Sequence, residues 1–119
     1  MLKTLVLSGN RRIGDEGASA ISEGLKSNKS LTELKLYRCG IGSEGGTALA
    51  SMLEVNAVLH NLRIAGNNIG DEGVAAFAQA ISKAPALALK QLVVPAKVER
   101  DERLKAVCES KGVTLVERH

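Results

Sequence analysis

Residues 59–73 read LHNLRIAGNNIGDEG, and the same pattern occurs twice earlier in the chain. Residues 31–45 read LTELKLYRCGIGSEG, and residues 2–17 read LKTLVLSGNRRIGDEG. The isoleucines of the three copies, Ile13, Ile41 and Ile69, are 28 residues apart. A fixed period in this range predicts a solenoid, in which each unit buries its apolar face against its neighbours.

Each copy opens with the pattern Leu-x-x-Leu-x-Leu, whose period of two predicts a short, half-buried strand. The residues expected to face inward are Leu5 and Leu7, Leu34 and Leu36, and Leu62 and Ile64. The residues between them vary from copy to copy. Stacked in register, the strands would form a parallel sheet whose exposed face carries these variable side chains.

A helix is predicted after each strand. Apolar residues four apart lie on one helix face, and each copy has such a pair: Ile21 and Leu25, Leu49 and Leu53, and Phe77 and Ile81. Asp15, Ser43 and Asp71 are suitable N-cap residues, each followed by a glutamate. We expect each of these residues to cap its own helix. Because the acidic residues recur at the same place in the repeat, capping explains their presence and no catalytic role is needed.

The turn out of each strand carries Asn10, Cys39 or Asn67. An amide side chain can satisfy buried peptide groups between adjacent repeats. Cysteine does so less well, so we expect packing to hold the middle repeat. The first copy has one additional residue, and we interpret Arg11–Arg12 as a solvated bulge; the alternative is a basic loop at the rim of the sheet.

The pattern loosens after Pro85. Residues 89–94 restore the strand pattern until Pro95, residues 98–112 predict a charged amphipathic helix ending at Gly112, and residues 113–116 predict a last strand. We predict a single domain over residues 1–119, with repeats at about 2–30, 31–58 and 59–86 and a degenerate repeat and C-terminal cap at 87–119. A solenoid needs such a cap to shield its last apolar repeat.

The first strand directly follows Met1, so its edge and the side chains of Leu5 and Leu7 have no covering element in this sequence. An open strand edge tends to pair with another chain. We expect further repeats upstream, a partner, or self-association through a second copy to cover this edge.

The repeated pattern resembles the ribonuclease-inhibitor-like subfamily of leucine-rich repeats over residues 2–25, 31–53 and 59–81. The resemblance implies an α/β horseshoe segment with a parallel sheet on the concave side and helices on the convex side. Proteins with this pattern include ribonuclease inhibitor, the Ran GTPase-activating protein, NOD-like receptors and the capping domain of tropomodulin. Nearly all of them act by binding another protein. Asn10 and Asn67 match only the structural asparagine of the repeat, so no catalytic residue is carried over.

Composition excludes several other classes of function. The formal net charge of +3 is mild, and aromatic residues make up only 2% of the chain, so we predict no nucleic-acid binding. No apolar run approaches the ~18 residues that span a bilayer, and no signal peptide opens the chain. We therefore expect a cytoplasmic protein that does not associate with a membrane. Cys39 and Cys108 match no metal or redox spacing, and we expect both to be reduced and buried. No cofactor motif or catalytic constellation occurs, so we predict no enzyme.

The best candidate surface is the concave face of the sheet. It would hold a partner-binding set consisting of Glu33, Lys35, Tyr37, Arg38, Asn61, Arg63 and Gln91. Tyrosine and arginine are common anchors at protein interfaces, and the basic residues favour a partner with an acidic surface. We predict a non-catalytic protein-interaction module, a fragment or subunit of a larger assembly. The alternative, which rests on the resemblance to the Ran activator, is a domain that activates a small GTPase.

Overall fold

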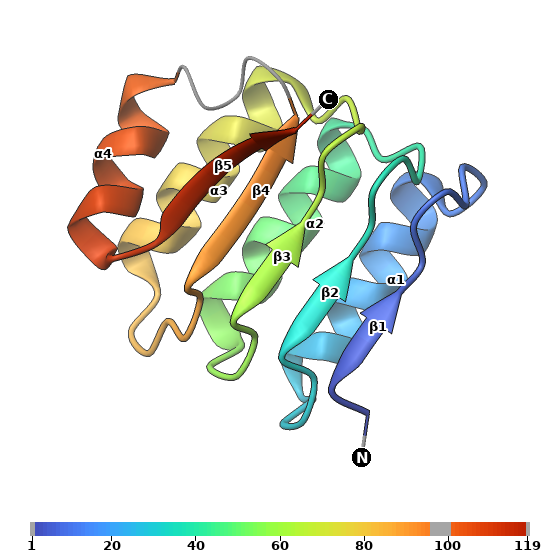
Figure 1. The fold of residues 1–119 in the computed structure, drawn as a ribbon, viewed down its shortest axis with the longest axis horizontal. Coiled ribbons are helices and arrows are strands. Elements are labelled where there is room, and N and C mark those ends of the chain that lie inside the picture. The colour runs from blue at the N-terminus through green and yellow to red at the C-terminus, as the bar shows by residue number, and fades with distance from the viewer. Residues whose placement is uncertain (1, 96–100, 119) are drawn as a thin grey trace.

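The computed structural model describes residues 2–95 and 101–118 (Figure 1). Within these residues five strands alternate with four helices. The strands are β1 (Thr4–Val6), β2 (Glu33–Lys35), β3 (Asn61–Arg63), β4 (Gln91–Pro95) and β5 (Thr114–Arg118). The helices are α1 (Gly14–Lys26), α2 (Ser43–Val55), α3 (Gly70–Lys83) and α4 (Glu102–Lys111).

All strand pairs are parallel, in the order β1-β2-β3-β4-β5. Figure 1 shows the strands in one sheet with the helices together on its far side, each helix returning the chain to the next strand. The predicted α/β solenoid with a parallel sheet on one side and helices on the other is therefore confirmed.

The core lies between the sheet and the helices. The parallel register stacks Leu34 on Leu62 and Leu62 on Leu92, and all three are fully buried. From the helix side they are met by buried residues at the predicted positions, which include Leu49 and Phe77. Burial of each such side chain contributes about 1.5–3 kcal/mol. The stack explains why an almost aromatic-free chain holds its repeats together.

Asn67 joins the second and third repeats, as predicted. Its Oδ1 accepts hydrogen bonds from the backbone N–H groups of Cys39 and Ile41, at 2.9 and 3.1 Å. Its Nδ2 donates to the carbonyl oxygens of Leu36 and Ile64, at 2.7 and 2.9 Å. The side chain is buried, so one residue satisfies backbone groups that water cannot reach.

Cys39 takes the equivalent place between the first two repeats. Its thiol donates to the carbonyl oxygen of Leu7 at 3.2 Å and to that of Tyr37 at 3.7 Å. Asn10 is exposed, and its Nδ2 donates to the carbonyl oxygen of Leu7 in its own repeat, at 2.7 Å. Cys39 therefore makes the cross-repeat contact of the asparagine with a weaker donor. Both cysteines are free and buried, as predicted.

The prediction that Asp15, Ser43 and Asp71 cap their own helices is wrong. The helices begin earlier than expected, with Ile13, Gly42 and Ile69 at the N-cap positions and no side-chain cap. Asp15 lies within the first turn of α1 and caps the next helix instead. Its Oδ1 accepts hydrogen bonds from Gly42 N–H and Gly45 N–H, at 2.6 and 2.9 Å. The packing of α1 against α2 places the Asp15 carboxylate beside the N-terminus of α2. The spacing of residues in the sequence alone does not reveal this contact.

The C-terminal segment folds as a helix and a strand that extend the stack, as predicted. Helix α4 begins after Asp101, whose side chain accepts a hydrogen bond from Leu104 N–H at 2.9 Å, and ends at Gly112 in a left-handed conformation. The predicted helical residues 98–100 lie outside the described residues. Strand β4 ends at Pro95, the residue predicted to stop it, and Pro95 lies opposite Arg118 of β5.

At the other end of the sheet, β1 is less protected. Leu5 and Leu7 are only partly buried, while Leu2 and Val6 remain 59% and 57% exposed. Self-association or further repeats at this end stay predictions.

Candidate functional site

Two rows of side chains cross the side of the sheet that faces away from the helices, and we call this surface the sheet face. The register aligns the first row as Thr4, Glu33, Asn61, Gln91 and Thr114. It aligns the second row as Val6, Lys35, Arg63, Val93 and Val116. Five of the predicted binding residues are brought together here: Glu33, Lys35, Asn61, Arg63 and Gln91.

Glu33 lies at the centre of the charged part of the sheet face. Its Oε2 is 3.9 Å from Lys35 Nζ and 3.8 Å from Arg63 Nε. The hydroxyl of Thr4 donates to its Oε1 at 3.5 Å. These ion pairs are long and partly solvated, so each contributes about 0–1 kcal/mol to stability. The ion pairs orient the side chains of Lys35 and Arg63. The single carboxylate of Glu33 does not neutralise both positive charges.

Next to this cluster, two polar atoms lack hydrogen-bond partners. Asn61 Nδ2 donates to Gln91 Oε1 at 2.8 Å. Within the described part of the chain, Asn61 Oδ1 and Arg63 Nε are buried and form no hydrogen bond. The 3.8 Å separation from Glu33 gives Arg63 an ion pair but is too long for a hydrogen bond. Buried polar groups without partners are rare in folded proteins, so this pair marks a specific feature of the sheet face.

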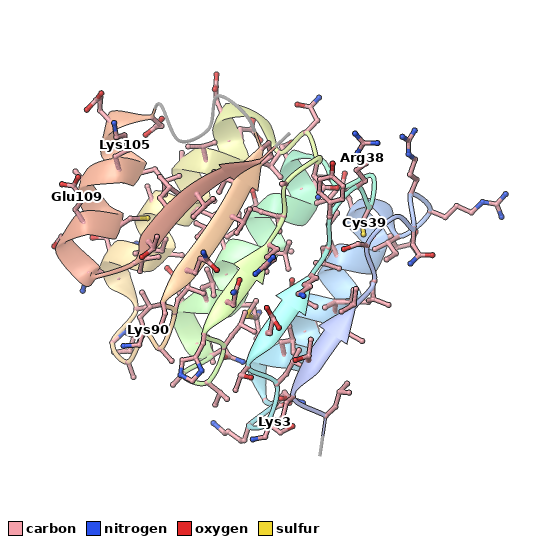
Figure 2. The ribbon with its side chains drawn as sticks, in the orientation of Figure 1. Lys3, Arg38, Cys39, Lys90, Lys105 and Glu109 are labelled. Atoms are coloured by element: carbon pink, nitrogen blue, oxygen red, sulfur yellow. The ribbon has the colours of Figure 1, made fainter. Side chains whose placement is uncertain are left out.

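Tyr37 and Arg38 lie beyond the carboxyl end of β2, and Arg38 does not join the two rows. Figure 2 shows Arg38 at the end of the molecule toward which the strands point, opposite Lys3. Its guanidinium carbon lies 5.2 Å from the centre of the Tyr37 ring, a cation–π contact. The predicted binding set is therefore divided between the sheet face and the loops at the strand ends.

A pocket of about 410 Å³ opens among these loops. It is lined by residues of three successive repeats: Arg11, Arg38, Gly40, Ile41, Gly42, Gly66, Asn67 and Asn68. We call it the strand-end pocket. Arg11 is outside the predicted binding set; the Arg11–Arg12 pair was interpreted as a solvated bulge, with a basic loop at the rim of the sheet as the alternative. The signal available was the single-residue insertion, which pushes this loop toward the next repeat.

Both cysteine thiols have raised pKa values. Burial raises the pKa of the Cys39 thiol, while backbone hydrogen bonds at Asn10 and Gly9 lower it by less. Burial also raises the pKa of Cys108, to about 11, so both thiols are protonated at neutral pH. In residues 2–95 and 101–118, no three His, Cys, Asp or Glu side chains come together as a metal site. In the same residues, no helix has the length and apolar character needed to cross a membrane.

Comparisons with known proteins agree with the architecture. A family model described as "Leucine Rich repeat" matches residues 1–22, 27–50 and 55–78, more than half of the chain. Among solved structures, actin-binding site 2 of leiomodin-1 is similar, with a TM-score of 0.82 over 98% of this chain and 70% of that one. The sequence identity to it is 17%, so this likeness concerns the fold. No curated protein matches the sequence.

Proposed function

This chain belongs to the leucine-rich repeat family, and from that premise we propose that it is a non-catalytic module that binds a protein partner through its sheet face. The observation that carries the proposal is the cluster of partly exposed charged side chains on that face, in which Lys35 and Arg63 flank Glu33.

The charges of the sheet face favour an acidic contact surface on the partner. Lys35 and Arg63 share the single carboxylate of Glu33, which leaves an excess of positive charge in the middle of the face. A carboxylate of the partner would be attracted to this excess and would accept a hydrogen bond from the exposed part of the Arg63 guanidinium. Arginine suits this role because its planar guanidinium presents several donors in a fixed geometry.

Actin is a reasonable first partner to test, because the similar structure is an actin-binding site of leiomodin-1. Because a shared fold does not establish a shared binding partner, a second way of identifying the partner is needed. Affinity capture from cell extract, followed by rebinding to the purified candidate, would provide one. In either case the prediction concerns the surface used rather than the identity of the partner.

The test compares binding to the purified partner by two charge-reversed variants. In the first, Lys35→Glu is combined with Arg63→Glu on the sheet face. In the matched control, Lys83→Glu reverses an exposed charge at the end of α3. We expect the sheet-face variant to bind at least about tenfold more weakly and the control to bind like the wild type. Wild-type affinity in the sheet-face variant would refute the proposal.

Two further expectations from the sequence stay predictions. Activation of a small GTPase is tested by GTP hydrolysis in the presence of this chain. Pairing of two chains at β1 is tested by light scattering over a range of concentrations, with Val6→Lys as the variant that should abolish it.

A further inference from the structure

The backbone conformation of Arg38 is unusual for an arginine. The equivalent positions of the first and third repeats are Gly9 and Gly66, and their φ angles are +86° and +76°. Arg38 has a φ of +53°, and among the described residues it alone adopts a positive φ without being glycine. Left-handed backbone suits glycine and is unfavourable for residues with a Cβ atom. Strain of this kind persists where the surroundings or the function require the side chain.

The surroundings fix the direction of the Arg38 side chain. A Cβ atom on Gly66 would lie 2.6 Å from Arg38 Cγ and 3.0 Å from Tyr37 Cε1. The aliphatic part of Arg38 therefore occupies the space that a side chain at residue 66 would need. The Tyr37 ring, 5.2 Å from the guanidinium carbon, holds the charged end. Arg38 is thus pre-organised at the strand-end pocket.

A second arginine reaches the pocket from the first repeat. The additional residue in that repeat brings the Arg11 loop so close to the second repeat that a Cβ on Gly40 would collide with the Arg11 carbonyl oxygen. Arg11 and Arg38 both line the pocket. Within residues 2–95 and 101–118, neither guanidinium lies within ion-pair distance of a carboxylate. Two arginines that form no ion pair within these residues therefore line one pocket.

We propose that the strand-end pocket binds a carboxylate side chain from an acidic segment of a protein partner, held between Arg11 and Arg38. Guanidinium groups match the planar carboxylate through paired hydrogen bonds. The volume of about 410 Å³ is in the range of about 300–1,000 Å³ that is typical of ligand pockets. The inference rests on the proposed function, since it adds a second contact to the partner that the sheet face binds.

The nearby charges favour a carboxylate over a phosphate. Asp15 lies next to the pocket, with both carboxylate oxygens within 3.3 Å of the position that a Cβ of Gly42 would occupy. Its negative charge lowers the positive potential that Arg11 and Arg38 create, which disfavours a doubly charged ligand more than a singly charged one. Tyr37 directly follows the sheet face, so a single partner segment can reach both places.

The experiment uses a short polyglutamate peptide as the probe and follows the backbone amide signals of the full chain by NMR. We expect the largest shifts at Gly40, Gly66 and Asn68, around the pocket. Arg38→Gly, which suits the left-handed backbone, and Arg11→Gln should each weaken binding of the peptide by about 10- to 100-fold. Arg12→Gln is the matched control, because Arg12 is the exposed neighbour of Arg11 and does not line the pocket. It should change the affinity by less than about twofold.

The outcomes separate this proposal from the proposed function. Shifts confined to Lys35 and Arg63, unaffected by Arg11→Gln and Arg38→Gly, would overturn the pocket and leave the sheet face supported. Pocket shifts that persist in a Lys35→Gln/Arg63→Gln variant would support the pocket independently of the sheet face. Tighter binding of inorganic phosphate or of a single-stranded oligonucleotide than of polyglutamate would overturn the carboxylate assignment. The absence of any shift with polyglutamate would overturn the proposal as a whole.

Discussion

The carboxylate of Asp15, in the first turn of α1, caps the N-terminus of α2 by accepting a hydrogen bond from Gly42 N–H at 2.6 Å. The same oxygen accepts from Gly45 N–H at 2.9 Å. The first turn of a helix has N–H groups that have no backbone acceptor within that helix. Here the preceding repeat supplies the acceptor, so the cap also fixes the position of one repeat relative to the next.

Asp15→Ala should therefore lower the free energy of unfolding by about 1–2 kcal/mol, the usual cost of losing a helix cap. Urea denaturation followed by circular dichroism measures the change. Asp71→Ala is the matched control, because Asp71 has the same position in the first turn of α3 and is exposed. Both variants lose a negative charge near a helix N-terminus, so the difference between them reports the cross-repeat bonds. Equal destabilisation of the two variants would contradict this account.

Asn67→Ala should be the more severe change. It removes the acceptor for two buried N–H groups, those of Cys39 and Ile41, and the donor to the carbonyl oxygen of Leu36. Each unsatisfied buried group costs about 1–3 kcal/mol, so we expect a loss of at least about 3 kcal/mol. Asn10→Ala, at the equivalent but exposed position, should cost about 1 kcal/mol or less. Thermal unfolding of both variants under the same conditions tests the ranking, and a smaller effect at Asn67 than at Asn10 would refute it.

Much of the fold was predictable because the repeat imposes the same local chemistry several times. The alternation at Leu34 and Leu36 and the helical pair Leu49 and Leu53 each agree with the structure, since side-chain periodicity follows directly from backbone geometry. The cap formed by Asp15 was not predictable. It depends on the distance between two neighbouring helices, and nothing in the spacing within one repeat encodes that distance.

The candidate site was only partly predictable, for a related reason. Residues within a strand keep their register across a parallel sheet, so the grouping of Lys35 with Arg63 follows from the repeat alone. Loops have no such constraint. Arg38 lies off the sheet face because it follows the end of β2, in a turn where its φ is +53°, and Arg11 lines the same pocket from the loop that has the additional residue. The glycines at the equivalent positions were a usable signal, since they show that position 38 needs left-handed backbone.

The conformation of Arg38 leads to a prediction about stability. Arg38→Gly and Arg38→Ala both remove the contact with Tyr37, but only glycine relieves the left-handed strain. We expect the glycine variant to have a free energy of unfolding higher than that of the alanine variant by about 1 kcal/mol. In an ordinary position the order would be reversed, because glycine increases the entropy of the unfolded chain. Urea denaturation of the two variants decides the matter, and a more stable alanine variant would show that position 38 is unstrained.

The buried thiol of Cys108 should lower the stability of the fold as the pH rises through the alkaline range. Burial raises the pKa of this thiol from 9.0 to about 11, which means that the folded chain keeps the proton when the unfolded chain loses it. The contribution of the protonated Cys108 thiol to the free energy of unfolding is complete below about pH 9. It is lost as the pH rises toward about 11. Since each pKa unit corresponds to about 1.4 kcal/mol, the loss has an upper bound of about 2–3 kcal/mol. Other groups titrate in this range, so the measurement is the difference in the free energy of unfolding between the wild type and Cys108→Ala at several pH values. That difference should shrink between pH 9 and pH 11, and a constant difference would mean that the thiol ionises equally in the folded and unfolded chains.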